Sequence, residues 1–146
     1  MAQTIDDIIA DFDFLDDWED RYRYVIDLGR ELKPYPDTAR DAAHKVNGCV
    51  SQVWLKGTLG DGADPMIEFV GDSDAHIVRG LVAIMMVLYS GKKASEILAV
   101  DPEAILKKLG LVENLTPQRS NGLRSMIGRI RNEAQAALGA ANATQH

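Results

Sequence analysis

The chain contains one cysteine, Cys49, and its chemistry is limited because it is alone. A single thiol cannot close a disulfide within the chain, and it cannot hold a cysteine-rich zinc or iron–sulfur site without other ligands. Cys49 is therefore either an inert buried side chain or a single nucleophile. The neighbouring residues favour the nucleophile, because Asn47-Gly48 is a turn dipeptide and Gly48 places no side chain beside the sulfur.

The residues on either side of this turn predict how the thiol is held. A strand is expected from Ser51 to about Leu59, so Cys49 would lie where a mobile turn enters a strand. His44 and Lys45 precede the turn, and a nearby cation would favour the thiolate, whose ordinary pKa is about 8.5. Both residues are more simply interpreted as solvated surface groups.

Composition is that of an ordinary globular domain. The 146 residues suffice for one domain with a hydrophobic core. The net charge of -6 argues against nucleic acid or anionic membranes as partners. The start, Met1–Asp7, lacks the pattern of a secretory signal, and a lone cysteine suits a reducing cytoplasm. The apolar run Ile77–Leu88 falls short of the roughly 20 residues that span a bilayer, and it predicts a buried helix.

The elements that position the thiol are expected to form one α+β domain over residues 1–139. The strand from Ser51 and a second strand, Met66–Val70, form an antiparallel hairpin through a turn at 60–65, as the basis of a small sheet of two or three strands. An apolar helix over Ala75–Tyr89 would cover one face of this sheet. Other helices are expected from Thr4, from Asp16 or Asp17 to about Leu32, over Ala94–Ala99, from Asp101 to near Gly110, and from Thr116-Pro117 to about Leu138, before a disordered tail at 140–146.

An acidic cluster precedes the apolar helix. Ser73 or Asp74 as a helix cap is a simpler interpretation than Asp72 and Asp74 as a metal pair, because the glutamate and spacing of a calcium loop are missing. His76 has no second histidine on its face, so it is expected to be structural or exposed.

Three arginines, Arg124, Arg129 and Arg131, lie largely off the apolar stripe of the last helix. They are expected on a solvated face rather than in a docking patch.

Four blocks of the sequence, taken in order, resemble the SufE family. They are Gly48–Trp54 (GCVSQVW), Gly71–Ala75 with Ile77–Leu81, Leu115–Ser120, and Gly122-Leu123. The similar region extends from Asp17 to Leu138. Segments 37–45 and 60–65 do not resemble the family, which leaves open how the approach to Cys49 is shaped and which partner is preferred.

The resemblance implies a SufE-like fold and a role in sulfur transfer. Cys49 would accept sulfur from the persulfide of a pyridoxal-phosphate-dependent, SufS-like cysteine desulfurase, stimulate that enzyme, and pass the sulfur to an iron–sulfur scaffold complex in the cytoplasm. The chain itself would hold no cofactor and no metal, since the pyridoxal phosphate belongs to the desulfurase. A carrier with a covalent persulfide is not clearly an enzyme, and a homodimer is left open.

SufE proteins shelter their cysteine in an apolar recess until its loop moves. By resemblance, Gly48 is the expected hinge, and Val50, Val53 and the apolar helix are expected to line the recess.

Three further residues are expected to support the site: Ser51, Asp74 and Arg119. Arg119 is hypothesised to stabilise a thiolate or persulfide anion. An ion pair of Arg119 with Asp72 or Asp74 is an equal alternative.

Two other functions stay open. A cysteine-based reductant or peroxidase would need a base or a second thiol near Cys49, and the chain has no second cysteine. A noncatalytic adaptor would stimulate a desulfurase by docking alone, and replacing Cys49 by serine would distinguish it from a sulfur carrier.

Overall fold

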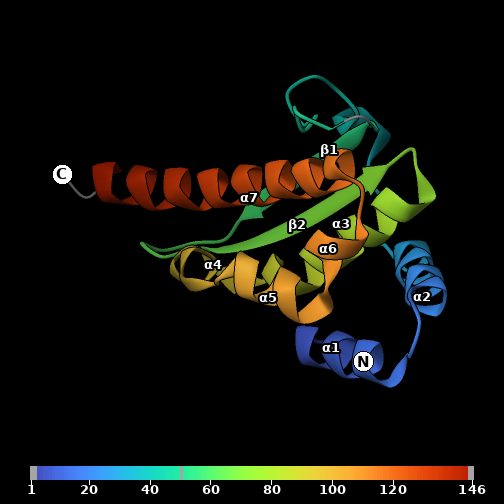
Figure 1. Ribbon diagram of the computed structural model, residues 1–146. Coiled ribbons are helices and arrows are strands. Elements are labelled where there is room, and N and C mark those ends of the chain that lie inside the picture. The colour runs from blue at the N-terminus through green and yellow to red at the C-terminus, as the bar shows by residue number, and fades with distance from the viewer. Residues whose placement is uncertain (1–2, 50, 145–146) are drawn as a thin grey trace.

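The computed structural model describes residues 3–49 and 51–144. In chain order the elements are α1 (Ile5–Phe14), α2 (Trp18–Arg30), the 3-10 turn η1 (Asp37–Ala39), β1 (Val53–Leu59), β2 (Met66–Ser73), α3 (His76–Tyr89), β3 (Lys92–Lys93), α4 (Ala94–Ala99), α5 (Pro102–Leu109), α6 (Leu111–Asn114) and α7 (Pro117–Thr144). Figure 1 shows the sheet with α3 and α7 beside it and the remaining helices around them.

The sheet has three antiparallel strands in the order β1-β2-β3, which confirms the expected α+β fold. In the hairpin, Val53 lies opposite Ser73 and Leu59 lies opposite Ile67. Because side chains alternate along a strand, Val53, Leu55 and Ile67 all point to the same face, where each is fully buried. The strand limits differ slightly from the sequence-based ones, since β1 begins at Val53 rather than Ser51 and β2 continues to Ser73.

The apolar helix α3 is the centre of the core, packed between the sheet and α2. Two glycines allow α2 and α3 to approach closely. A Cβ atom at Gly80 would lie 2.1 Å from the carbonyl oxygen of Val25, and one at Gly29 would lie 2.7 Å from the backbone nitrogen of Gly80. The backbones of the two helices are therefore in direct contact, which fixes the position of α3 against the sheet and α7.

Helix α7 is longer than the sequence indicates. Its apolar stripe is buried as expected, with Leu123, Met126 and Ile130 each at most 1% exposed. Its predicted end near Leu138 is too early, because the backbone stays helical through Gly139 to Thr144, over most of the segment 140–146 predicted as a disordered tail. A lone glycine costs a helix about 1 kcal/mol, and the alanines around it favour continuation. Residues 145–146 lie outside the described part of the chain.

The N-terminal caps of the helices agree with the sequence-based predictions for α1, α2 and α5 but not for α3. Thr4 caps α1 in a capping box with Asp7, and Asp17 and Asp101 cap α2 and α5, as expected. Helix α3 is different, because its N-cap is Ala75, without a side-chain cap. The prediction that Ser73 or Asp74 caps α3 is therefore wrong.

No helix within the described residues is long and apolar enough to cross a membrane.

Candidate functional site: the Cys49 loop

Cys49 follows a glycine whose conformation and surroundings both exclude a side chain. Gly48 has φ +89°, in the left-handed region that favours glycine. A Cβ atom at Gly48 would also lie 2.6 Å from Oγ of Ser125 on α7. The turn that the sequence predicts at Asn47-Gly48 is thus pressed directly against α7. We call residues 47–51 the cysteine loop; Val50 within it lies outside the described residues.

The cysteine loop is closed by hydrogen bonds at both ends. Before it, the N–H of Val46 donates to the carbonyl of Val53 at 2.8 Å, which adds a short strand-like segment to the edge of β1. After it, the N–H of Gln52 donates to Oδ1 of Asp74 at 3.0 Å, and the N–H of Asp74 donates back to the carbonyl of Gln52 at 3.3 Å. Asp74 therefore fixes the end of the loop instead of capping α3.

The segment before the loop, residues 35–46, is held against the rest of the protein by contacts of Arg129 on α7 and of its own Arg40. We call it the approach segment. Arg129 on α7 donates to the carbonyls of Ala43 at 2.7 Å and Lys45 at 3.3 Å. This corrects the expectation of a solvated face, because a residue from the other end of the chain supports the backbone that leads to Cys49. Arg131, which was expected on the same solvated face, also binds backbone carbonyls, but those of Leu98 and Val100 and not of the approach segment.

Arg40 holds the approach segment on the outer face of the sheet. Its guanidinium carbon lies 5.2 Å from the ring centroid of Tyr35 and 5.1 Å from that of Trp54, between two aromatic side chains. Its Nη2 contacts Asp72 at 2.7 Å, and Asp72 also contacts Nε of Arg79 at 2.9 Å. Burial raises the pKa of Asp72, but the hydrogen bonds from Arg40 and the Ser73 N–H, together with the positive charges of both arginines, outweigh it, so the pKa lies below its ordinary value.

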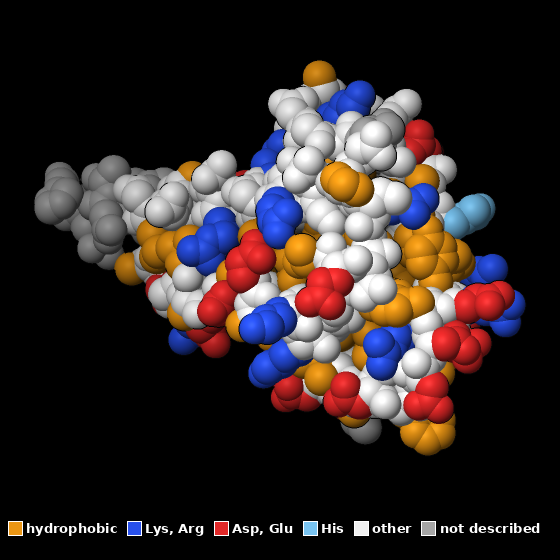
Figure 2. All heavy atoms as spheres, in the orientation of Figure 1, with side chains coloured by type: hydrophobic (Ala, Val, Ile, Leu, Met, Phe, Trp, Pro, Cys, Tyr) orange, Lys and Arg blue, Asp and Glu red, His pale blue; other side chains and the backbone are white. Residues whose placement is uncertain are grey.

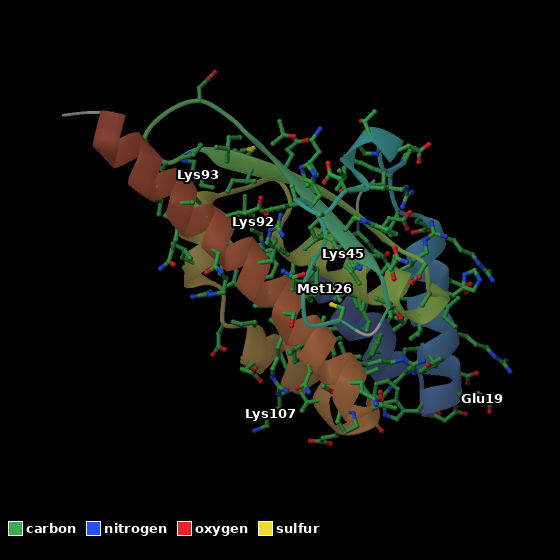
Figure 3. The ribbon with its side chains drawn as sticks, turned by 90° about the horizontal axis from the view of Figure 1, so that it is seen from above. Glu19, Lys45, Lys92, Lys93, Lys107 and Met126 are labelled. Atoms are coloured by element: carbon green, nitrogen blue, oxygen red, sulfur yellow. The ribbon has the colours of Figure 1, made fainter. Side chains whose placement is uncertain are left out.

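A cavity of about 250 Å³ opens beside Cys49. Its lining comes from the cysteine loop, from α3, from Thr116 just before α7 and from the N-terminal half of α7: Cys49, Ser51, Val78, Leu81, Thr116, Gln118, Arg119, Gly122 and Met126. The expectation that the apolar helix lines a recess agrees with this placement of Val78 and Leu81. Val53, also expected there, is buried in the core instead, and the same expectation for Val50 falls outside the described residues. Figure 3 labels Met126 on α7 and Lys45 on the approach segment.

The thiol of Cys49 is half-buried, and its surroundings favour the neutral form. It points toward the carbonyl oxygen of Gly122 on α7, to which the S–H donates at 3.6 Å. Burial raises the pKa of the Cys49 thiol above its ordinary value. Of the two cations considered in the sequence, His44 contacts Oδ1 of Asp41 at 2.7 Å and Lys45 is exposed. The protein at rest therefore presents a sheltered thiol and not an activated thiolate.

Arg119 faces the same cavity and is held from the side. Its Nη1 donates to the hydroxyl of Tyr22 on α2, and its guanidinium carbon lies 5.8 Å from the ring centroid of Tyr22. The alternative ion pair of Arg119 with Asp72 or Asp74 is wrong, since those carboxylates contact Arg40, Arg79 and the backbone of Gln52. Arg119 is the only charged side chain among the described residues that line the cavity.

Within the described residues no three histidine, cysteine or acidic side chains gather as a metal site. On the face shown in Figure 2, basic and acidic side chains are interspersed, so no large patch of one sign of charge is visible there.

The roles of three residues of the site were missed by sequence: Tyr22 and Arg40 were not considered as site residues, and Arg129 was expected on a solvated face. Tyr22 has the spacing of a core residue, because it falls at helical intervals from Trp18 and Val25, and Arg40 lies in a segment without a clear pattern. Gly122, by contrast, belongs to one of the blocks that resemble a family, so its position against Cys49 had a sequence signal.

The fold and the site define a small α+β domain arranged around one sheltered thiol. The family model described as "SufE: Fe-S metabolism associated domain" matches residues 6–134. The chain therefore belongs to the SufE family and has a role in iron–sulfur metabolism.

Relatives agree with this assignment. An uncharacterised SufE-like protein of Rhizobium meliloti (strain 1021) is 57% identical over 136 residues, covering 92% of this chain and 97% of the relative. One of Rhizobium etli is 62% identical over 133 residues, covering 90% of both chains. The solution structure of a hypothetical protein from Thermus thermophilus has a TM-score of 0.73 at 19% identity, covering 92% of this chain and 96% of the other, and shows the same fold.

Proposed function

We propose that Cys49 accepts a sulfane sulfur from the persulfide of a pyridoxal-phosphate-dependent cysteine desulfurase and passes it to an iron–sulfur scaffold. The observation that carries this proposal is the half-buried thiol on a glycine turn, beside a cavity, in a chain of the SufE family. The partners would meet this chain in the reducing cytoplasm, where a single thiol stays reduced.

The transfer needs one thiol on each protein. The Cys49 thiolate attacks the terminal sulfur of the desulfurase persulfide, a new sulfur–sulfur bond forms, and the desulfurase cysteine leaves as its thiolate. The proton of the Cys49 thiol goes to solvent or to the partner, and no electrons are gained or lost overall. A second thiol nearby would displace the sulfur as sulfide, so a solitary cysteine suits a carrier.

The resting geometry supports a carrier that is inactive until it docks. A raised pKa and a contact with the Gly122 carbonyl both disfavour the thiolate at the resting position. The thiol must therefore leave this position to react. Asp74 and the Val46–Val53 hydrogen bond hold the residues at either end of the loop, so the movement that exposes the sulfur would begin between these two points.

The cavity also supports storage of the sulfur. It offers space beside the sulfur atom, with apolar walls from Val78, Leu81 and Met126. A persulfide is easily reduced or oxidised, so a carrier gains from keeping it away from small thiols and oxidants in solution. A redox-sensing function is less well supported, because such cysteines are usually exposed and have lowered pKa values.

The test is desulfurase turnover with and without this chain, using the wild type and Cys49→Ser. A carrier gives stimulation that the serine variant loses completely. Stimulation that survives the substitution would instead identify a noncatalytic adaptor, because docking alone would then suffice. Arg124→Ala is a suitable control, since Arg124 lies in an exposed ion pair with Glu103 away from the cavity.

A further inference from the structure

Tyr22 does not line the cavity, but it contacts Arg119, the one charged side chain among the described lining residues, and restrains its position. An arginine side chain is long and loses considerable rotational freedom when it is fixed. The hydroxyl of Tyr22 accepts a hydrogen bond from Nη1 of Arg119, and the Tyr22 ring lies beside the guanidinium, with 5.8 Å between its centroid and Cζ. Two contacts of different kinds thus restrain the same group.

The platform that carries Tyr22 is rigid. Tyr22 belongs to α2, whose backbone is in direct contact with α3 through Gly29 and Gly80. Arg119 lies in the first turn of α7, where its own N–H donates to Oγ1 of Thr116 at 3.3 Å. The hydrogen bond between the two side chains therefore links separate helices across the rim of the Cys49 cavity.

Loading with sulfur changes what the site must stabilise. An unloaded Cys49 gives its S–H to the carbonyl of Gly122, but Sγ of a persulfide has no hydrogen to give. The terminal sulfur of the persulfide is acidic and carries negative charge when ionised, so it requires donors. Among the described lining residues, the long polar side chains at the start of α7 are Gln118 and Arg119, and only Arg119 is charged.

We propose that Tyr22 is a positioning residue that fixes the Arg119 guanidinium at the rim of the cavity, where it stabilises the ionised terminal sulfur of a Cys49 persulfide. This inference rests on the proposed function, since it concerns the loaded form of the same cysteine. A fixed guanidinium stabilises an anion better than a mobile one because its orientation does not have to change when the charge appears.

The matched control is Tyr24, two residues further along α2. Its hydroxyl donates to Asp11 at 2.6 Å and accepts from Gln3 at 2.8 Å, and neither partner lines the cavity. Tyr22→Phe and Tyr24→Phe each remove one hydroxyl from the same helix and keep the ring. Only the first removes a contact with Arg119.

The experiment loads the full chain without a desulfurase. Inorganic polysulfide converts the Cys49 thiolate to a persulfide by displacement at sulfur, releasing a shorter polysulfide. The persulfide is then alkylated with iodoacetamide at a series of pH values, with release of iodide, and the product is followed by intact mass. Because Cys49 is the only cysteine, each mass change reports on one sulfur chain.

The proposal predicts that Tyr22→Phe moves the pH midpoint of persulfide alkylation upward and slows the reaction roughly threefold or more at the acidic end. Arg119→Ala should give at least as large a shift, and Tyr22→Phe should add nothing in the Arg119→Ala background. Tyr24→Phe should leave the midpoint unchanged. The midpoint is a sharper readout than activity, because a merely structural loss would not displace it.

Two results would overturn the proposal: a wild-type midpoint in Tyr22→Phe, or equal shifts from Tyr22→Phe with and without Arg119. Because the sulfur is supplied chemically, these results do not depend on a desulfurase. Failure of the proposed function would appear separately, as a wild-type chain that takes no sulfur from the enzyme.

Discussion

The approach segment and the cysteine loop are adjacent in the chain but are held in different ways. The approach segment is bound by Arg40 to the sheet and by Arg129 to α7, through contacts that bring together distant parts of the chain. The cysteine loop is hydrogen-bonded at its two ends, and the hydrogen bond of the Cys49 thiol, to the carbonyl of Gly122, is a long one of 3.6 Å. By this difference, we expect an opening that exposes the thiol to start in the cysteine loop while the approach segment stays in place.

The largest loss of stability is expected when a side chain is placed at Gly48 in the turn. Gly48→Ala requires alanine to adopt a positive φ and places a Cβ atom against Ser125, so it should lower the free energy of unfolding by about 2–3 kcal/mol. Urea denaturation measures this loss. Gly62→Ala is the matched control, because Gly62 also has a positive φ but open space around it, and it should cost only about 1 kcal/mol. Equal losses would show that the turn is not pressed against α7.

The second prediction concerns the clamp on the approach segment. Arg129→Ala leaves the carbonyls of Ala43 and Lys45 without their donor, and it should lower the free energy of unfolding by about 1–2 kcal/mol. Arg124→Ala, which removes only an exposed ion pair, should change it by less than about 0.5 kcal/mol. Similar values for the two variants would show that Arg129 does not stabilise the approach segment and behaves as the solvated residue that the sequence predicts.

The third prediction concerns Asp74, which holds the end of the cysteine loop through the Gln52 N–H. Asp74→Ala removes the acceptor for the Gln52 N–H, so the loop should open more often and iodoacetamide should modify Cys49 roughly three to ten times faster at constant pH. Asp74→Asn keeps a side-chain oxygen at the same place and should retain most of the protection. An alanine variant that reacts at the wild-type rate would show that Asp74 does not restrain the loop.

The smallest expected effect is in the pH dependence of the thiol itself. Because burial raises the pKa of Cys49, the midpoint of its alkylation should lie above the ordinary cysteine value of about 8.5, and it should return to that value in denaturing urea. The neutral thiol thus contributes stability below the unfolded-state pKa, and this contribution is lost as the pH rises through the folded-state pKa. A folded-state midpoint below the ordinary value would mean that the resting site activates the thiolate.

The parts of the site that local sequence signals describe were predicted well. The turn at Asn47-Gly48, the hairpin and the buried apolar helix follow from residue type and periodicity, whereas the place of that helix in the wall of the recess followed from the resemblance to the SufE family. The assignment of Asp74 failed because two local roles competed. An acidic side chain suits both a cap on α3 and a hydrogen bond to the Gln52 N–H, and the hairpin decides between them because it brings Asp74 next to Gln52, just beyond the ends of β1 and β2.

The parts that depend on distant partners were not predictable from one sequence. Arg129 lies 84 residues from Lys45, and Arg119 lies 97 residues from Tyr22. An arginine off the apolar stripe has the same local pattern whether it is solvated or binds backbone carbonyls elsewhere in the fold. Only the packing of α7 beside the approach segment distinguishes these roles.

Whether Cys49 receives sulfur is tested by intact-mass measurement of this chain after incubation with a cysteine desulfurase and free cysteine. The wild type should gain the mass of one sulfur atom, a reductant should remove it, and Cys49→Ser should gain nothing. A wild-type chain that stays at its original mass, while the desulfurase carries its own persulfide, would contradict the claim that Cys49 receives the sulfur.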